Sequence, residues 1–413
     1  MMRLSTLPSG LRVLTDSQMT ANTVAVGFWV GVGTRHEDEG ETGIAHVFEH
    51  MLFKGTPKRS ALAISTDMEN VGGNINAYTS REQTAYFARV LKEDAKLAID
   101  VLADMLQNSL FPEDELDKER QVIIQEIHQT KDTPDDIIID YWHEAAFPGQ
   151  TLGRSILGNE QIISKIKRQD LVRYQQHYAL NNMIVAASGA IEHDAFCELA
   201  AEYFLNIPQH HAVRPGAAMY RGGRRLENRQ LEQTHIIIGF QGVPASDPRF
   251  HALSLYTTLL GGGMSSRLFQ EIREKRGLVY AIQASTASYA DGGLVGAYAA
   301  TNPGLIPQLL PLMAEVWKES AVNPVQEELD RAKAQLRAGL LMSLESTSQR
   351  LEQLAHYYLT YGRIVEPEEN LAQLMDVTLD DVHQIAQQIL KSPITIAAVG
   401  PTDEVEKWEG FGL

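Results

Sequence analysis

Residues Gly43–Gly55 read GIAHVFEHMLFKG and carry two histidines and a glutamate within a helix-forming segment. His46 and His50 are four positions apart, so on a helix both imidazoles project from one face and can reach a single metal ion. Glu49 follows His46 by three positions and lies on the same side. The stretch therefore predicts a short helix that ends near Gly55 and presents a metal-binding face.

The segments on either side of this helix predict a mixture of strands and further helices. Apolar, β-branched runs between turn residues indicate strands, whereas apolar residues at three- and four-residue spacing indicate helices. The expected strands are Leu11–Thr15, Thr23–Val32, Asn74–Thr79, Thr84–Val90 and Met183–Ser188. The expected helices are Ser60–Val71, Glu93–Asn108, a long segment from Pro112 through Glu126 towards Lys131, and Asp170–Tyr178.

Three features of the first half recur in the second half at a shared offset of about 212 residues. Gly27-Phe28 matches Gly239-Phe240, Glu115-Leu116-Asp117 matches Glu328-Leu329-Asp330, and the strand before Gly189 matches the strand before Gly400. Because unrelated coincidences would not share one offset, we infer a tandem duplication. The expected domains are residues 1–208 and 224–413, joined by a linker at 209–223 that is rich in proline and glycine.

The second copy lacks the candidate metal ligands. The shared offset pairs His46 with Thr258 and His50 with Gly262, and the local register pairs Glu126 with Gly339. A requirement of the scaffold should act on both copies, whereas a metal site can be kept in only one. The asymmetry therefore favours a functional role for the two histidines.

Two imidazoles leave a tetrahedral zinc ion two ligands short, and a catalytic site fills one position with a protein group and the other with water. Glu119 and Glu126 are both candidates for the third ligand, because they are seven residues apart on one stripe of the helix after Pro112. Their spacing does not choose between them. Zinc lowers the pKa of its bound water from about 15.7 towards 7, and Glu49 is placed to accept the proton. The order H-x-x-E-H inverts the H-E-x-x-H motif of zinc proteases.

Composition and net charge indicate the general class of protein and its expected location. The 413 residues are 44% hydrophobic and 22% charged, which is typical of a globular protein with more than one core. A net charge of −17 argues against nucleic-acid binding and would favour basic peptides if the acidic residues line a cavity. There is no apolar run long enough to span a membrane, no recognisable signal peptide and only one cysteine, Cys197. We therefore expect a cytoplasmic protein.

Several motifs resemble the pitrilysin-type (M16) zinc metallopeptidases, particularly the branch of the mitochondrial processing peptidase β-subunit and its bacterial relatives. They are HVFEHMLFKGT at His46–Thr56, GGNINAYT at Gly72–Thr79, ERQVIIQE at Glu119–Glu126, ILG at Ile156–Gly158 and the Y-x-x-x-N-M that ends at Met183. The resemblance covers almost the whole chain. It implies an α+β fold in which two similar α/β domains, each a mixed, largely antiparallel sheet with helices packed on it, form half of a clamshell chamber.

The resemblance also implies roles for individual residues. His46, His50 and Glu126 match the family's zinc ligands, with one Zn²⁺ per chain, and Glu49 matches its catalytic base. Glu119 matches an additional glutamate that supports the site without being a primary ligand. The strand Asn74–Thr79 matches a substrate-binding edge strand, on which an extended peptide can pair by β-augmentation. The substrate-binding candidates there are Asn76, Ala77 and Tyr78.

A second family signature is an arginine and a tyrosine seven residues apart in the C-terminal domain. Arg273 and Tyr280, in REKRGLVY, match it, and such a pair can hold a substrate carbonyl and the oxyanion that develops on it. Arg276 is a less favoured alternative, because it is only four residues from the tyrosine. The resemblance implies a homodimer in which Arg273 and Tyr280 complete the zinc site of the other chain.

These observations together predict a zinc endopeptidase that hydrolyses unfolded peptides or leader segments inside a dimeric chamber. The alternative is a noncatalytic scaffold or assembly subunit of the same fold. The presence of the ligands, the base and the Arg/Tyr pair in one chain disfavours that alternative.

Overall fold

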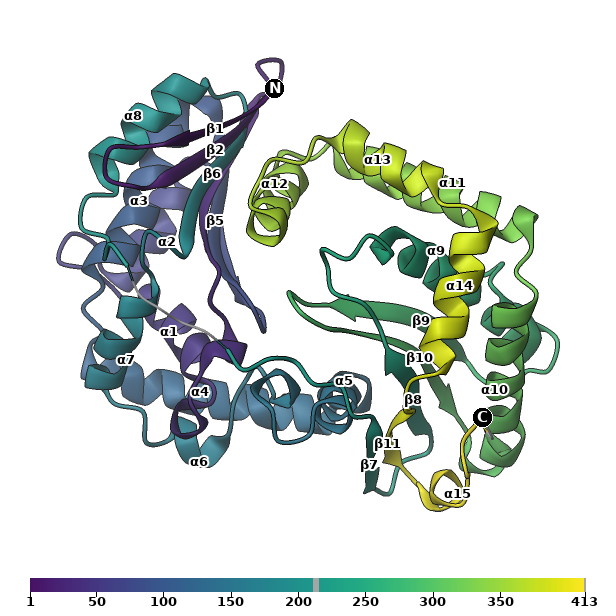
Figure 1. Cartoon of the computed structure of the whole chain (residues 1–413). Coiled ribbons are helices and arrows are strands. Elements are labelled where there is room, and N and C mark those ends of the chain that lie inside the picture. Colours follow the sequence, from purple (N-terminus) through teal and green to yellow (C-terminus); the bar gives the residue numbers. More distant parts are fainter. Residues whose placement is uncertain (211–214, 412–413) are drawn as a thin grey trace. The chain divides into compact units, whose positions relative to one another are not determined.

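A computed structural model describes residues 1–210 and 215–411 and divides the chain into two compact units. Each unit is assembled from three separate segments of the chain (Figure 1). Unit 1 contains Met1–His128, Arg154–Pro215 and Leu341–Glu366, and unit 2 contains Gln129–Gly153, Gly216–Leu340 and Pro367–Leu413. Part of the expected linker, residues 211–214, lies outside the described residues.

The sheet of unit 1 has six strands in the order β1-β2-β6-β3-β5-β4. The strands are β1 (Met2–Thr6), β2 (Arg12–Ser17), β3 (Thr23–Val30), β4 (Asn74–Thr79), β5 (Thr84–Leu91) and β6 (Met183–Gly189). Only β2 and β6 pair in parallel, and the other neighbours are antiparallel. This mixed, largely antiparallel sheet confirms the fold expected from the sequence, although β1 was not among the expected strands. β4 lies at one edge of the sheet.

The sheet of unit 2 repeats this pattern with five strands in the order β7-β11-β8-β10-β9. The strands are β7 (Gly223–Asn228), β8 (Thr234–Gln241), β9 (Ala281–Ser288), β10 (Gly293–Thr301) and β11 (Thr395–Gly400). β7 and β11 are parallel, as β2 and β6 are, and the other pairs are antiparallel. The two sheets therefore have the same connections, with β9 as the counterpart of the edge strand β4.

Helices pack on both faces of the unit 1 sheet. The helices of this unit are α1 (Ile44–Leu52), α2 (Ala61–Glu69), α3 (Ala95–Asn108), α4 (Glu113–Asp132, whose last turn belongs to unit 2), α6 (Glu160–Ile163), α7 (Arg168–Tyr174), α8 (His193–Tyr203) and α12 (Thr347–Tyr361). The larger core lies between the sheet and the helices α1, α3, α7 and α8. A smaller core lies on the opposite face, where Leu351, Leu354 and Tyr358 of α12 pack against Leu14 and Trp29.

Unit 2 has the same two-core arrangement. Its helices are α5 (Pro134–Ala146), α9 (Phe250–Gly261), α10 (Ile306–Val322), α11 (Gln326–Ser343, which ends in unit 1), α13 (Pro367–Asp376), α14 (Leu379–Leu390) and α15 (Asp403–Glu406), with a π-helical turn at Phe269–Glu274. The larger core includes residues of α9, α10 and α14. The smaller core packs α5 against Ile237, Ala397 and Val399 of the sheet.

Two helices are exchanged between the halves of the sequence. α5 comes from the first half but packs in unit 2, and α12 comes from the second half but packs in unit 1. Trp142 of α5 lies so close to the sheet that a Cβ at Gly239 would meet its Nε1 at 2.5 Å, and one at Gly296 its Cζ2 at 2.7 Å. The two copies in the sequence therefore differ from the two compact units by this exchange.

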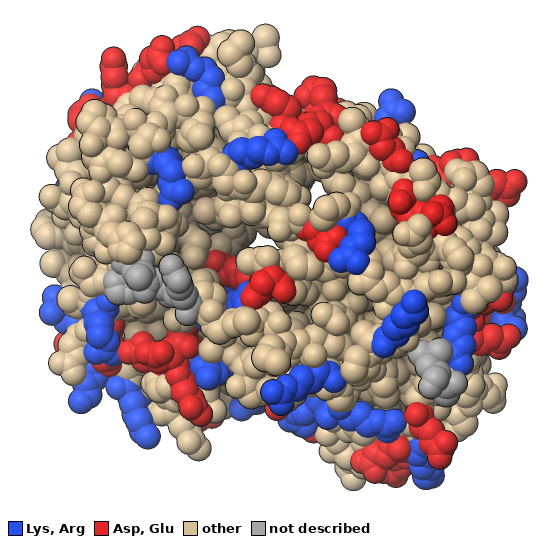
Figure 2. Space-filling view, viewed as in Figure 1, with Lys and Arg blue, Asp and Glu red and all other residues tan. Residues whose placement is uncertain are grey.

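Charged side chains are distributed over the surface of both units. Figure 2 shows acidic and basic residues in small, interspersed groups on the face drawn there, separated by uncharged surface. On that face the excess of acidic residues forms no single continuous patch. Among the described residues, none of the helices combines the length and the apolar character that crossing a membrane needs.

Candidate metal centre

The predicted motif helix is α1, and its start is fixed by the buried carboxyl group of Glu37, whose pKa burial raises to about 8. Val47, Phe48 and Met51 turn into the core, so that the two histidines and Glu49 lie on the partly exposed side. Gly43 precedes the helix at φ +96°, a conformation that favours glycine. Glu37, only 3% exposed, accepts the backbone N–H groups of Gly43 at 2.8 Å and Ala45 at 2.9 Å. These two bonds satisfy donors that a helix start leaves unpaired.

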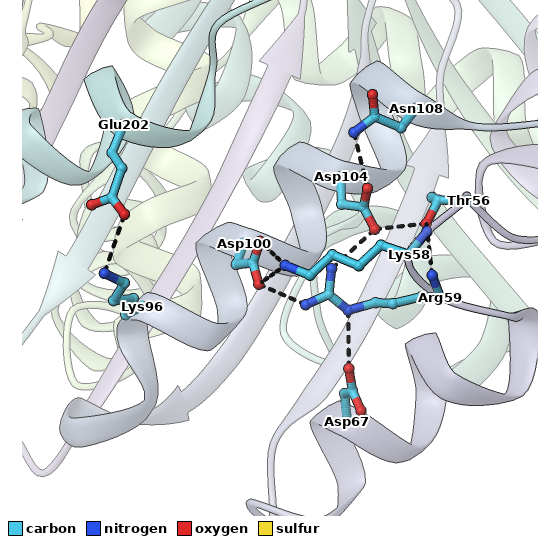
Figure 3. Close-up of polar contacts among 9 residues, drawn as sticks. All are labelled: Thr56, Lys58, Arg59, Asp67, Lys96, Asp100, Asp104, Asn108 and Glu202. Atoms are coloured by element: carbon cyan, nitrogen blue, oxygen red, sulfur yellow. Dashed lines mark hydrogen bonds and ion pairs between the residues drawn. The ribbon is translucent and has the colours of Figure 1, made fainter.

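The chain that leaves α1 is held by a cluster of ion pairs (Figure 3). The Arg59 side chain is 6% exposed and contacts three carboxylates: Asp67 of α2 at 2.9 Å, and Asp100 and Asp104 of α3 at 2.6 and 3.0 Å. Thr56 also donates its hydroxyl to Asp104, at 2.7 Å. The candidate metal-binding face is therefore carried by a helix whose two ends are both anchored.

α1 and α4 bring the three predicted ligands together. One ligand atom of each of His46, His50 and Glu126 lies within 4.8 Å of the other two. Glu126 Oε2 is 3.8 Å from the Nε2 atom of His46 and 3.8 Å from that of His50. The three side chains are 13%, 19% and 37% exposed, so the group lies at the surface of unit 1 and remains accessible. Two imidazoles and a carboxylate form a donor set that suits zinc.

Glu119 orients one of the imidazoles. Its Oε2 is 2.8 Å from His50 Nδ1, and its Oε1 is 2.6 Å from Lys54 Nζ. Burial acts to raise the pKa of Glu119, but the hydrogen bonds from His50 and Lys54 outweigh it and hold that pKa below its ordinary value. An ionised Glu119 accepts the Nδ1 proton of His50, which leaves the Nε2 lone pair directed towards Glu126. The spacing of the sequence left Glu119 and Glu126 as alternatives, whereas the structure places them on opposite sides of His50.

The two histidines have different electrostatic surroundings. Burial, with the neighbouring His50, lowers the pKa of His46 to about 3, so this imidazole is neutral at neutral pH. Burial also acts to lower the pKa of His50, but the hydrogen bond to Glu119 and the charges of Glu126 and Glu49 outweigh burial and raise it. The Nδ1 atom of His46 is buried and has no hydrogen-bond partner among the described residues. A metal ion binds the neutral form of an imidazole.

Glu49 lies beside the ligands and is held by a residue of the edge strand. Its Oε2 accepts a hydrogen bond from Thr79 Oγ1 of β4 at 2.5 Å. Burial raises the pKa of Glu49, and the hydrogen bond from Thr79 opposes part of that rise. A carboxylate with a raised pKa is a stronger proton acceptor, which suits a general base.

The substrate-binding candidates lie on β4, which pairs with β5 along one side only. Asn76 is exposed, and its Oδ1 accepts the backbone N–H of Ala77 at 2.9 Å. Tyr78 is partly buried, and its hydroxyl donates to Glu352 of α12. An edge strand with one unpaired side can accept a further strand.

Arg273 and Tyr280 lie close together within unit 2. The guanidinium carbon of Arg273 is 5.5 Å from the ring centroid of Tyr280 and 4.6 Å from that of Phe269. Tyr280 is 78% exposed and directly precedes β9. Arg276 instead binds Glu271, with contacts of 2.9 Å to its carboxylate and 2.7 Å to its carbonyl oxygen. This pairing favours Arg273 over Arg276 as the partner of the tyrosine.

Four residues with clear structural roles at this site were not singled out in the sequence. They are Glu37, Lys54, Thr79 and Glu352. Lys54 and Thr79 lie within the motifs HVFEHMLFKGT and GGNINAYT, so their positions were a signal that could have been used. Glu352 is far from every motif in the sequence and reaches the site only because α12 is exchanged into unit 1.

An α+β fold with a His/His/Glu donor set and an adjacent carboxylate defines a class, that of candidate metal-dependent hydrolases. Comparison with known protein families identifies the family within this class. Residues 12–160 match the model of insulinase (peptidase family M16), and residues 165–336 match that of the peptidase M16 inactive domain. The chain belongs to peptidase family M16. The description of the second domain as inactive agrees with Thr258 and Gly262 standing where the first copy has histidines.

Full-length relatives support this assignment. An uncharacterized zinc protease of Rickettsia bellii is 37% identical over 402 residues, which cover 97% of this chain and 98% of the relative. One of Streptomyces coelicolor is 37% identical over 410 residues, covering 97% and 89%. A probable mitochondrial-processing peptidase subunit beta of Arabidopsis thaliana is 35% identical over 427 residues, covering 99% and 80%. The chain is therefore related to peptidases along nearly its whole length.

Two solved structures share the fold. A peptidase M16 inactive domain from Pseudomonas fluorescens superposes with a TM-score of 0.90 at 22% identity, covering 97% of this chain and 98% of that one. A protease from Helicobacter pylori gives the same TM-score and identity and covers 97% and 100%. At this identity the likeness establishes the fold.

Proposed function

We propose that this chain is a zinc-dependent endopeptidase that hydrolyses unfolded peptides or leader segments, with Glu49 as the general base. The observation that carries the proposal is the convergence of His46, His50 and Glu126, whose ligand atoms lie within 4.8 Å of one another, beside the carboxylate of Glu49. Membership of a peptidase family and relatives described as zinc proteases support it.

The donor set fits zinc in its chemistry. His46 and His50 offer nitrogen atoms, Glu126 offers an oxygen atom, and the ionised Glu119 holds the Nδ1 proton of His50. These three ligands would hold one Zn²⁺ per chain. Zinc, when bound, supplies a Lewis acid that polarises a peptide carbonyl and makes water more acidic.

Glu49 performs the proton transfers in this proposal. Its carboxylate takes a proton from the attacking water and later gives it to the amine that leaves. The raised pKa of Glu49 favours the first transfer, because a more basic carboxylate holds the proton more strongly. One residue can therefore serve as base and then as acid.

The edge strand β4 positions the peptide in this proposal. An extended substrate would pair with the free side of β4, near Asn76, Ala77 and Tyr78, through main-chain hydrogen bonds that do not depend on its side chains. Such pairing requires an unfolded segment, because a folded protein does not offer a free strand. The net charge of −17 would favour segments that carry basic residues.

Arg273 and Tyr280 would hold the substrate carbonyl and its developing oxyanion, and we propose that they act on the zinc site of a second copy of this chain in a homodimer. Their proximity to each other in unit 2 supports a joint role. The test is to mix Glu49→Gln chains with Arg273→Ala chains, each of which is inactive alone. Random exchange makes half of the dimers mixed, with one intact site of two, so about a quarter of the wild-type activity should return. No recovery, with mixed dimers verified by mass spectrometry, would contradict sharing between chains.

The proposed activity itself is tested with purified wild-type protein. We expect peptides to be cleaved at internal bonds, with cleavage abolished by a chelator and restored by added Zn²⁺, as followed by mass spectrometry of the products. A protein that binds zinc but cleaves none of a broad peptide library would instead support the noncatalytic alternative, a scaffold or assembly subunit.

A further inference from the structure

The last two residues of β4 point in opposite directions and contact two different helices. Thr79 donates its hydroxyl to Glu49 Oε2 on α1 at 2.5 Å. Tyr78, on the other face of the strand, donates its hydroxyl to the Glu352 carboxylate on α12 and accepts from Gln83 Nε2 at 3.1 Å. Successive side chains of a strand project to opposite faces, so these two neighbouring residues connect β4 to α1 on one face and to α12 on the other.

The contact with Thr79 restricts the orientation of the Glu49 carboxylate. A glutamate has three rotatable side-chain bonds, and holding it in one geometry has an entropic cost that a fixed partner offsets. The threonine hydroxyl has one proton to donate, and it is given to Oε2. Oε1 makes no hydrogen bond with any described residue and is left to accept a proton. Thr79 is not a candidate ligand and would not itself exchange protons.

The contact with Glu352 restricts the strand. β4 is an edge strand that is paired to β5 along one side only, so its end has fewer restraints than a central strand. The Tyr78 ring is fixed from the other face by Glu352 and also accepts from Trp29 Nε1 at 3.4 Å. A helix from the second half of the sequence therefore anchors the strand that orients the base.

We propose that Thr79 is a positioning residue for Glu49, and that Glu352, acting through Tyr78, holds the end of β4 in the place that this requires. The inference rests on the proposed peptidase function. Its consequence is that the strand expected to pair with the peptide also sets the direction of the carboxylate that takes the proton. Substrate register and base orientation are then fixed by one element.

The test compares Thr79→Val, which keeps the shape of the side chain but removes the hydroxyl, with Thr79→Ser, which keeps the hydroxyl. Loss of a hydrogen bond to a charged group predicts a fall in kcat of roughly 10- to 100-fold for Thr79→Val. We expect KM and the zinc content to stay at wild-type values. The serine variant should recover kcat to within about threefold of wild type, because it retains the donor.

A second background separates positioning of the base from a general effect on the fold. In Glu49→Gln chains the base is absent, so adding Thr79→Val should cause no further fall in kcat and should leave the Kd for an uncleaved peptide unchanged. Glu352→Leu, which removes the acceptor, should lower kcat in the same direction as Thr79→Val, and in a Tyr78→Phe background it should have no further effect.

Each unfavourable outcome is distinct. If the wild-type protein cleaves peptides and Thr79→Val has the same kcat, the role of Thr79 is wrong while the peptidase assignment stands. Equal losses for the valine and serine variants, or an additional loss in Glu49→Gln chains, would also overturn positioning of the base. Additive losses for Glu352→Leu and Tyr78→Phe would overturn the part played by Glu352. A wild-type protein that cleaves no peptide would overturn the proposed function itself.

Discussion

The two copies of the repeat build the same sheet but place different side chains at equivalent positions of their helices. In the first copy, His46 and His50 face outward from α1 beside Glu126. In the second copy, Thr258 donates its hydroxyl back to the Ser254 carbonyl of its own helix at 2.9 Å. Gly262 has no room for a side chain, because a Cβ there would meet Thr258 Cα at 2.7 Å. The fold is therefore built in the second copy without the candidate ligands, which favours a functional role for His46 and His50 in the first copy.

The surroundings of α9 in the second copy also differ from those of α1 in the first. Beside α9 there is a pocket of about 10 Å³, lined in part by Thr258, Ser266, Arg331 and Gln335, which is room for about one water molecule. At the start of α9, Asp247 Oδ1 accepts one backbone N–H, that of Arg249, at 2.8 Å, whereas Glu37 accepts two backbone N–H groups at the start of α1. The helix that carries the candidate ligands is the one whose start is held by two hydrogen bonds to a buried side chain.

Removing the ligands should have the largest effect. We expect the double variant His46→Ala/His50→Ala to lose bound zinc and all detectable peptidase activity, because a single carboxylate remains. Thr258→Ala, at the position equivalent to His46, should keep both. Metal analysis and a peptide-cleavage assay measure the two properties. Loss of zinc from the Thr258 variant would show that the second copy contributes to metal binding.

Removing the base should sharply lower kcat but keep the metal. Glu49→Gln retains the size of the side chain and loses its ability to accept a proton, so kcat should fall by about 10²- to 10⁴-fold. Zinc content should remain at the wild-type level, since Glu49 is not one of the three converging ligands. Steady-state kinetics measures this change, and a wild-type kcat for Glu49→Gln would refute the role of Glu49.

Removing the partner of His50 should weaken zinc binding without abolishing it. Glu119→Gln takes away the charge that accepts the Nδ1 proton of His50, and changes of this kind reduce metal affinity by about 10- to 100-fold. Glu115→Gln is a matched control on the same helix, because Glu115 pairs with the exposed Lys118. Competition with a chromophoric chelator measures both affinities. Equal affinities for the two variants would mean that Glu119 does not support the site.

The ion pairs of Arg59, after the end of α1, should contribute to the free energy of unfolding. Arg59→Ala leaves Asp100 and Asp104 without their shared partner, and breaking a buried ion pair costs about 3–5 kcal/mol in the free energy of unfolding. The Lys96–Glu202 pair in Figure 3 is exposed, with side chains 60% and 55% accessible, so Lys96→Ala should leave the denaturant midpoint unchanged. Chemical denaturation compares the two variants, and a similar midpoint for both would argue against a structural role for the Arg59 cluster.

Local patterns in the sequence were enough to predict the elements that carry the site. β4 spans Asn74–Thr79, the bounds of the expected strand, and α1 occupies the motif helix. The shared offset predicted two related domains, and the sheets confirm it by having the same strand connections. These features depend on residues close together in the chain, or on a repeat that is visible in it.

Contacts between distant parts of the chain were not predictable in this way. The exchange of α5 and α12 depends on which sheet each helix packs against, and helical periodicity does not specify that partner. Glu352 therefore gave no sign of its contact with Tyr78, 274 positions away. Thr79 lay in a motif, but only the fold shows that its hydroxyl meets Glu49 rather than solvent.

The contrast between the two copies is tested most directly by the zinc content of the purified wild-type chain, measured by plasma mass spectrometry against protein concentration. One zinc ion per chain is expected, because one copy presents a His/His/Glu donor set and the other presents Thr258 and Gly262 at the equivalent positions. Two ions per chain would contradict the asymmetry. No bound zinc after purification in zinc-containing buffer would contradict the metal centre itself.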